Sequence, residues 1–143
     1  MEYGLGFKTL VFSNQFKKIS MTFQELLAYK KSFSLAMKIF DMTKSFPKEE
    51  TYSLTDQIRR SSRSVSVTIA EAYRKRIYPK NFYSKLTDSD AENSETQVWL
   101  AFAFECQYIS KGLFEELTSE SQEIGKLINY MILNPEKFGS KKE

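Results

Sequence analysis

The chain has 143 residues, enough for one domain with a sizeable hydrophobic core. It contains no histidine and one cysteine, so it lacks the commonest general base, the commonest metal ligand and any intrachain disulfide. The formal net charge of +3 does not by itself point to a nucleic-acid partner. From this composition we expect no metal site and no cofactor, and we expect Cys106 to be a small core residue.

The first 20 residues precede the strong helical patterns. They contain a short apolar patch at residues 9–12, but not the basic start, sustained apolar run or small-residue cleavage site of a signal peptide. Nowhere does an apolar run approach the ~20 residues of a membrane span. We therefore expect residues 1–20 to be a poorly ordered extension or an overcalled start. The single cysteine suits a reducing cytoplasm, where we expect the protein to be.

The first two helical patterns cover about residues 23–45 and 54–76. In each, apolar residues recur at steps of three and four, and Pro47 interrupts the pattern between them. The second helix has small residues in its middle, which lets a neighbouring helix approach closely, and Ser53 stands at its expected N-cap. The predicted inward stripes are Leu26, Tyr29, Phe33, Met37 and Phe40 in the first helix, and Leu54, Ile58, Ser61 or Ser62, Val65, Ile69 and Tyr73 in the second.

The third pattern begins near Pro79, a residue suited to the first position of a helix, and continues to about Ile109. Its middle, residues 87–97, is almost wholly polar, so it could also be a loop that joins two short helices. We favour one long helix because this stretch lacks glycine and proline and because the apolar stripes on either side stay in phase. The inward positions of the middle would then need hydrogen-bond partners if they are buried: Ser89, Asn93 and Gln97.

The fourth helix is predicted over about residues 113–133, and Asn134 and Pro135 stop it. The chain has only five glycines and three prolines, which suits long helices and disfavours a fold of many β-turns. Four amphipathic helices joined by short turns predict an all-α fold, an up-down-up-down antiparallel four-helix bundle. The bundle would span residues 21–134, and residues 135–143 would form a polar, frayed tail.

Charge is divided unevenly along the chain. Residues 53–76 carry six basic and two acidic side chains, whereas residues 80–134 carry four basic and nine acidic ones. Such a division suits an anionic partner, or head-to-tail association between the unlike surfaces of two copies of the chain.

Two basic clusters lie on the second helix, one in its middle and one at its end. Tyr73 and Tyr78 lie near the second cluster and could stack on unpaired bases, so one hypothesis is that the clusters contact RNA phosphates. The alternative is structural. The arginines pair with the acidic third and fourth helices, within one subunit or between subunits, and the cluster at the C-terminus of the helix interacts favourably with the helix dipole. The candidate nucleic-acid-binding residues are Arg59, Arg60, Arg63, Arg74, Lys75 and Arg76.

No reaction can be assembled from the remaining polar residues. Asp88, Glu92 and Glu95 share a helical face, but di-metal sites in bundles use histidine beside glutamate, so a solvated or arginine-paired face is favoured over a metal site. Glu71 is expected to be partly buried, with an arginine or Asn93 as its partner. Without a nucleophile–base pair we predict that the protein has no catalytic residues and is not an enzyme.

Three stretches of the chain carry a resemblance. Residues 23–32 open the first helix around an aromatic residue, residues 57–72 join two arginines to a run of small residues, and residues 82–97 begin Phe-Tyr and end Glu-Thr-Gln. Together they resemble the four-helix-bundle proteins named after the intervening sequences of 23S rRNA, over about residues 23–133. The second stretch departs from the family pattern at three positions, with Ser66 for proline, Thr68 for asparagine and Ala72 for glycine.

This resemblance implies a closed homo-oligomer of four-helix subunits, a homopentamer. It also implies kinship with the accessory proteins of diversity-generating retroelements, which are similar basic pentamers that bind nucleic acid and a reverse transcriptase. We therefore expect a non-catalytic, oligomeric protein that binds RNA or serves as a ribonucleoprotein accessory factor through its basic second helix. The alternative is a homo-oligomeric protein-interaction scaffold whose arginines form inter-subunit salt bridges. The resembled family has no settled biochemical role.

Overall fold

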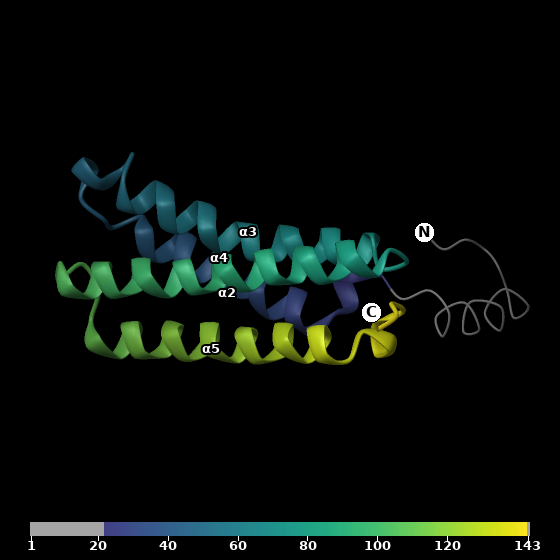
Figure 1. Cartoon of the computed structure of the whole chain (residues 1–143). Helices are drawn as coiled ribbons and strands as arrows, with labels where there is room; N and C mark the ends of the chain where they lie inside the picture. The colour runs from purple at the N-terminus through teal and green to yellow at the C-terminus, as the bar shows by residue number, and fades with distance from the viewer. Residues whose placement is uncertain (1–21, 143) are drawn as a thin grey trace, which may run out of the picture.

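The computed structural model describes residues 22–142, which form a bundle of four long α-helices (Figure 1). No β-strand occurs within the described range. The predicted all-α fold is confirmed, including the single long third helix. The extension predicted over residues 1–20 lies outside the described residues. The helices are α2 (Leu27–Thr43), α3 (Leu54–Arg74), α4 (Pro79–Glu105) and α5 (Lys111–Leu133), with short 3₁₀ turns η1 (Phe23–Glu25), η2 (Lys48–Glu50) and η3 (Pro135–Phe138).

The four helices run alternately up and down the long axis of the bundle (Figure 1). Each helix packs against the one that follows it in the chain, and contacts between α2 and α5 close the ring. Helix α4, with 27 residues, spans about 40 Å and sets the length of the rod. One end of the rod gathers the end of α3, the start of α4 and the end of α5, while the opposite end holds η2 and the turn between α4 and α5 (Figure 1).

Helix α2 buries a different face from the one that its aromatic residues predicted. The sequence pattern placed Tyr29, Phe33, Met37 and Phe40 inward, but Phe33 and Met37 are each 50% exposed, and the other two are only partly buried. The prediction was wrong because α2 carries two apolar stripes, and the stripe of smaller side chains lets α3 approach more closely. The residues that face the core are Ala28, Ser32, Leu35, Ala36, Ile39 and Met42.

The small residues of α3 bring this helix close to both of its neighbours, as the sequence predicted. The hydroxyl oxygens of Ser32 and Ser66 lie 3.0 Å apart between α2 and α3, and those of Ser61 and Thr96 lie 2.8 Å apart between α3 and α4. All four side chains are buried, so each hydroxyl finds its hydrogen-bond partner inside the core. These pairs favour one register of α3, because they form only at one relative height of the helices.

The polar middle of α4 is helical and makes a hydrogen-bonded core contact with α5. The Asn93 amide donates to the Ser121 carbonyl at 2.8 Å, and the Ser121 hydroxyl donates back to Asn93 Oδ1 at 2.9 Å. Gln97 Nε2 adds a bond to Ser121 Oγ at 2.9 Å. A Cβ at Gly125 would lie 3.3 Å from Asn93 Nδ2, so glycine gives the amide its room. Of the predicted inward residues, Ser89 and Asn93 are buried and Gln97 is partly buried.

Ser53 is the N-cap residue of α3, as predicted, but its side chain makes no capping bond. Glu50 holds the connection between α2 and α3 instead. One carboxylate oxygen of Glu50 accepts hydrogen bonds from the Ser53 hydroxyl at 2.5 Å and the Leu54 amide at 3.2 Å. The other oxygen accepts from the Tyr108 hydroxyl at 2.7 Å, which ties the connection to the turn after α4. The bonds from Ser53, Tyr108 and Leu54 lower the pKa of Glu50. The bond to Glu50 raises the pKa of Tyr108 to about 12.

Helix α4 ends in a turn in which Gln107 adopts a left-handed backbone, with a φ of 64°. The Tyr108 amide donates to the Ala103 carbonyl and the Gln107 amide to the Phe104 carbonyl, which is the pairing of a Schellman motif. Glycine is the usual residue at this position because a side chain is strained there. Gln107 therefore carries a local cost in stability that the surrounding contacts offset.

Residues 135–142 fold back onto the end of the bundle, contrary to the expectation of a frayed tail. A second left-handed turn follows η3, with Gly139 at a φ of 85° and the Ser140 amide bonded to the Pro135 carbonyl. Pro135 and Ser140 are buried. The Arg76 side chain lies against Gly139, where an added Cβ would come within 3.0 Å of it. The C-terminal segment is thereby part of the folded domain.

Candidate nucleic-acid interface

Arg59, in the middle of α3, makes its contacts within the subunit. Its Nε donates to the buried Thr43 hydroxyl at 2.7 Å, and its guanidinium lies 4.7 Å from the centre of the Phe40 ring. Both partners belong to α2. Arg59 is only partly exposed, and it ties α3 to the end of α2.

Arg60 forms an ion-pair cluster with α4. Its Nη2 lies 2.6 Å from Glu95 and 3.4 Å from Glu92, and Trp99 Nε1 donates to the same Glu95 oxygen at 3.0 Å. Partial burial lowers the pKa of Arg60, but its hydrogen bonds to Glu95 and Glu92 outweigh this effect and raise the pKa above its ordinary value. Two of the three carboxylates that were weighed as metal ligands, Glu92 and Glu95, thus face an arginine.

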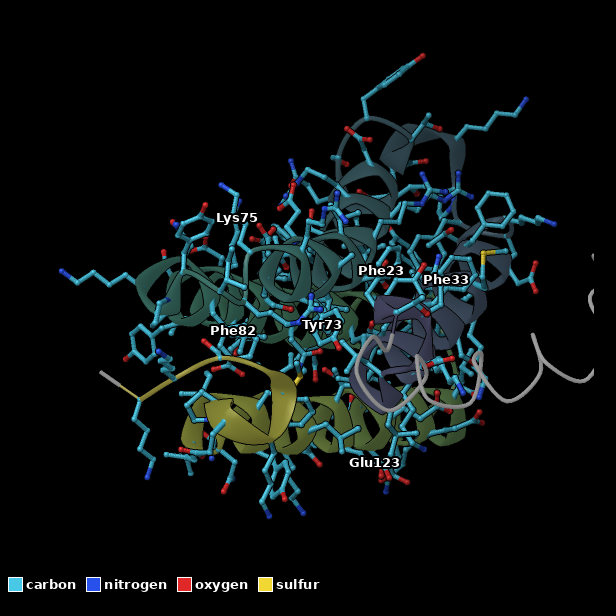
Figure 2. The ribbon with its side chains drawn as sticks, turned by 90° about the vertical axis from the view of Figure 1, so that its right-hand side faces the viewer. Phe23, Phe33, Tyr73, Lys75, Phe82 and Glu123 are labelled. Carbon is cyan, nitrogen blue, oxygen red and sulfur yellow. The ribbon has the colours of Figure 1, made fainter. Side chains whose placement is uncertain are left out.

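Arg63 stands at the edge of an apolar groove between α2 and α3. Its guanidinium lies 5.7 Å from the centre of the Phe40 ring, and it forms no salt bridge within residues 22–142. The groove has a volume of about 350 Å³, and its walls include Phe33 and Val67. Figure 2 shows Phe33 beside Phe23, which also lines the groove. The aromatic stripe that α2 keeps out of the core therefore forms one wall.

The basic cluster at the end of α3 is divided between one packed arginine and two exposed cations. Arg76 lies over the Tyr73 ring at 4.1 Å and donates from Nη1 to the Tyr73 carbonyl at 2.8 Å. Arg74 and Lys75 are exposed, and neither forms a salt bridge in the described part of the chain. In that part of the chain the positive charges of these two residues are therefore not neutralised by a carboxylate.

Further lysines join Arg74 and Lys75 at the same end of the bundle. Helix α3 ends there, α4 begins there, and the C-terminal segment folds back over it, as the end-on view shows (Figure 2). Residues 74–80 and 135–142 carry seven cationic side chains and one carboxylate, Glu136. We call the seven the basic end: Arg74, Lys75, Arg76, Lys80, Lys137, Lys141 and Lys142.

Four residues of the basic end were not among the candidates predicted from the sequence. Lys80 falls in the stretch with the acidic excess, and the other three fall in the segment that was expected to fray. The signal that could have revealed them is Phe138 followed by Gly139, an apolar residue before a glycine that can adopt the left-handed conformation of a closing turn.

The opposite end of the rod has the opposite charge. Residues 41–50 and 105–116 lie there and carry six carboxylates and three lysines. The uneven charge along the sequence thus becomes an uneven charge along the long axis of the molecule. A polyanion is attracted to the basic end and repelled by the other.

Two other expectations from the sequence are wrong. Glu71 is exposed and pairs with Lys85 at 3.1 Å, instead of with an arginine or Asn93. Cys106 is exposed rather than part of the core, because α4 ends just before it. Within residues 22–142 no group of three or more histidine, cysteine, aspartate or glutamate residues is placed to hold a metal ion.

None of the helices in that range combines the length and apolar character needed to cross a bilayer.

A known family matches most of the bundle. The profile of the 23S rRNA-intervening sequence protein covers residues 24–130. The chain belongs to this family. It is also similar to the crystal structure of a protein with unknown function from the S23 ribosomal protein family of Bacteroides thetaiotaomicron, with 29% sequence identity and a TM-score of 0.68. That similarity covers 75% of this chain and 96% of the other. No curated protein matches.

The range of the family match divides the basic end. Arg74, Lys75, Arg76 and Lys80 lie within the part that matches the 23S rRNA-intervening sequence protein, whereas residues 135–142 follow it. The C-terminal segment therefore adds its lysines to a bundle whose fold the family already defines.

Proposed function

We propose that this intervening-sequence family protein is a non-catalytic RNA-binding accessory protein that acts as a cytoplasmic homo-oligomer. The observation that carries the proposal is the basic end, where Arg74 and Lys75 lie exposed beside the lysines of α4 and of the C-terminal segment. An RNA strand presents a row of phosphates, and each phosphate neutralised by a cation releases counterions, which favours binding. The exposed rings of Tyr78 and Tyr83 add surfaces on which unpaired bases can stack.

The proposal moves the RNA contact from the middle of α3 to its end. Arg59 and Arg60 hold α3 against α2 and α4, so replacing them would disturb the bundle before it disturbed a phosphate contact. A reverse transcriptase is a further partner under this proposal, since the resemblance to retroelement accessory proteins implies one. The basic end would then hold RNA beside that enzyme.

Fluorescence anisotropy with a labelled single-stranded RNA of about ten nucleotides tests the proposal. Arg74→Glu/Lys75→Glu should weaken binding at least about tenfold, because two attractive charges become two repulsive ones. The matched control is Lys48→Glu/Lys111→Glu, which makes the same change in net charge at exposed positions of the opposite end and should bind RNA nearly as the wild type does. Equal losses in both variants would refute the basic end as the site.

A second proposal concerns assembly, and the groove between α2 and α3 supports it. Phe33, Met37 and Val67 expose apolar surface on two adjacent helices, and surfaces of this kind commonly mark sites of protein association. We propose that a second copy of the chain covers this groove, with Arg63 at its edge available for an ion pair across the contact. Repetition of the contact around a closed ring would build the homopentamer that the family resemblance implies.

The same contact would serve a protein-interaction scaffold that binds no RNA. Light scattering separates the possibilities when RNA affinity is measured on the same variants. Phe33→Glu should be a monomer, whereas Ser34→Glu, which adds the same charge at the next exposed position of α2, should remain assembled. A monomeric wild-type protein at micromolar concentration would contradict the assembly proposal. Assembly without RNA affinity would favour the scaffold.

A further inference from the structure

A pocket of about 510 Å³ lies at the basic end, between the start of α4, the end of α5 and the C-terminal segment. Its apolar lining includes the buried Phe82 ring, the exposed Leu133 side chain and the exposed Tyr83 ring. Figure 2 shows Phe82 beside the C-terminal segment. The pocket therefore offers apolar and aromatic surface within the basic end.

Three lysines line this pocket, and no carboxylate does. Lys80 comes from the first turn of α4, and Lys141 and Lys142 come from the C-terminal segment. The N-terminus of α4 adds the partial positive charge of the helix dipole on the same side. An apolar lining with a wholly cationic edge fits a ligand that is flat or apolar in one part and anionic in another.

The wall that supplies two of these lysines is anchored. Ser140, directly before Lys141, is buried. The left-handed turn at Gly139 reverses the chain, so that Lys141 and Lys142 line the pocket together with the first turn of α4. Arg76 packs against that turn and is itself held over the Tyr73 ring. The pocket is thus formed before a ligand arrives, which lowers the ordering cost of binding.

Two classes of ligand combine an apolar or flat part with an anionic part: small amphiphilic carboxylates and single-stranded RNA. The charge around the pocket distinguishes between them. A small amphiphilic carboxylate needs only the cations at the pocket edge. The cationic surface continues past the pocket to Arg74 and Lys75, which suits a ligand with a row of anionic groups. A single RNA strand has such a row, and its unstacked bases are apolar, flat and free to enter a pocket.

We propose that the pocket receives one unstacked base of a single-stranded RNA. The base stacks on Tyr83, and the phosphates on either side of it contact Lys80, Lys141 and Lys142. A base inside a duplex is already stacked and paired, so it cannot enter. The inference rests on the proposed RNA-binding function and adds that this site prefers single strands to duplexes.

Anisotropy titrations with a uridine oligonucleotide of about ten nucleotides, and with a duplex of the same length, test the inference. Tyr83→Ala should weaken single-strand binding by about 5- to 100-fold, the usual effect of losing one base–ring stack, and leave duplex binding unchanged. Tyr83→Phe keeps the ring and should keep the affinity. The control Tyr52→Ala removes a tyrosine that is 92% exposed at the opposite end and should change neither titration.

Two results would overturn the inference. Full single-strand affinity in Tyr83→Ala would show that the base does not stack there, and equal losses for single strand and duplex would show that the site does not select single strands. Either result leaves RNA binding standing if Arg74→Glu/Lys75→Glu still loses affinity. Binding of decanoate in the pocket, with no RNA affinity in the wild type, would overturn both proposals and assign the pocket to amphiphilic carboxylates.

The lysines of the C-terminal segment provide an independent second test. Lys141→Ala/Lys142→Ala leaves the buried anchor in place and removes two of the three cations at the pocket edge. It should lower single-strand affinity by about tenfold or more in low salt, with a smaller loss at high salt because the lost contacts are ionic. Unchanged affinity in low salt would overturn the phosphate part of the inference.

Discussion

The contact between Asn93 and Ser121 gives a prediction whose magnitude can be worked from the structure. Asn93→Ala removes the two side-chain hydrogen bonds between Asn93 and Ser121, at 2.8 and 2.9 Å. Each buried hydrogen bond contributes about 1 kcal/mol net, and truncating this buried side chain leaves a small cavity that costs about 1 kcal/mol more. We therefore expect Asn93→Ala to lower the free energy of unfolding by about 3 kcal/mol.

Urea unfolding followed by circular dichroism measures this loss, at one fixed protein concentration because assembly shifts apparent stability. Ser94→Ala is the control, since Ser94 is the next residue of α4 and is exposed; its effect should stay within about 0.5 kcal/mol. The double variant Asn93→Ala/Ser121→Ala should lose about 1 kcal/mol less than the sum of the single losses, because both single changes remove the one bond between the Ser121 hydroxyl and Asn93 Oδ1. Additive losses would refute the reasoning.

Three further outcomes concern the turns at the two ends. Gln107→Gly should raise the free energy of unfolding by about 1 kcal/mol in urea, since glycine adopts a φ of 64° without strain; no gain would show that the turn is not strained. The Tyr108 pKa of about 12 lies above the ordinary value of 10.0, so the stability from its bond to Glu50 is present below pH 10.0 and declines as pH rises toward 12. Tyrosinate absorbance measures that pKa, and Glu50→Gln should bring it back toward the ordinary value, whereas an unchanged pKa would exclude the bond as its cause. Gly139→Ala should speed proteolysis of the C-terminal segment, because alanine is strained at a φ of 85° and its Cβ would meet Arg76 within 3.0 Å; an unchanged cleavage rate would contradict the anchoring of that segment.

The number and order of the helices could be predicted because apolar residues recur at steps of three and four in each of them. The single long α4 could be predicted for the same reason, since Ser89, Asn93 and Gln97 keep the apolar stripes in phase. The buried face of α2 could not be predicted from α2 alone. Which face of α2 is buried depends on Ser66 of α3, whose hydroxyl oxygen lies 3.0 Å from that of Ser32. The two helices can come this close only on the side of α2 that carries the smaller residues.

The candidate site could be predicted only in part, because a cation in a sequence does not reveal whether a carboxylate will face it. Arg60 and Arg63 are three residues apart on one helix, yet Arg60 meets Glu95 on α4, while Arg63 borders the apolar groove. Arg74 and Lys75 stay exposed at the end of α3, and within residues 22–142 no carboxylate pairs with them. The C-terminal lysines enter the site through a fold-back that depends on tertiary contacts of Pro135 and Ser140.

The salt dependence of RNA affinity tests the central claim, that the basic end binds RNA, most directly. The logarithm of the binding constant falls with the logarithm of salt concentration by about 0.7 for each phosphate contact with a single strand. If the claim is right, Arg74→Glu/Lys75→Glu lowers this slope by about 1.4, for two lost contacts, while Lys48→Glu/Lys111→Glu keeps the slope of the wild type. Identical slopes for the wild type and both variants would contradict the claim.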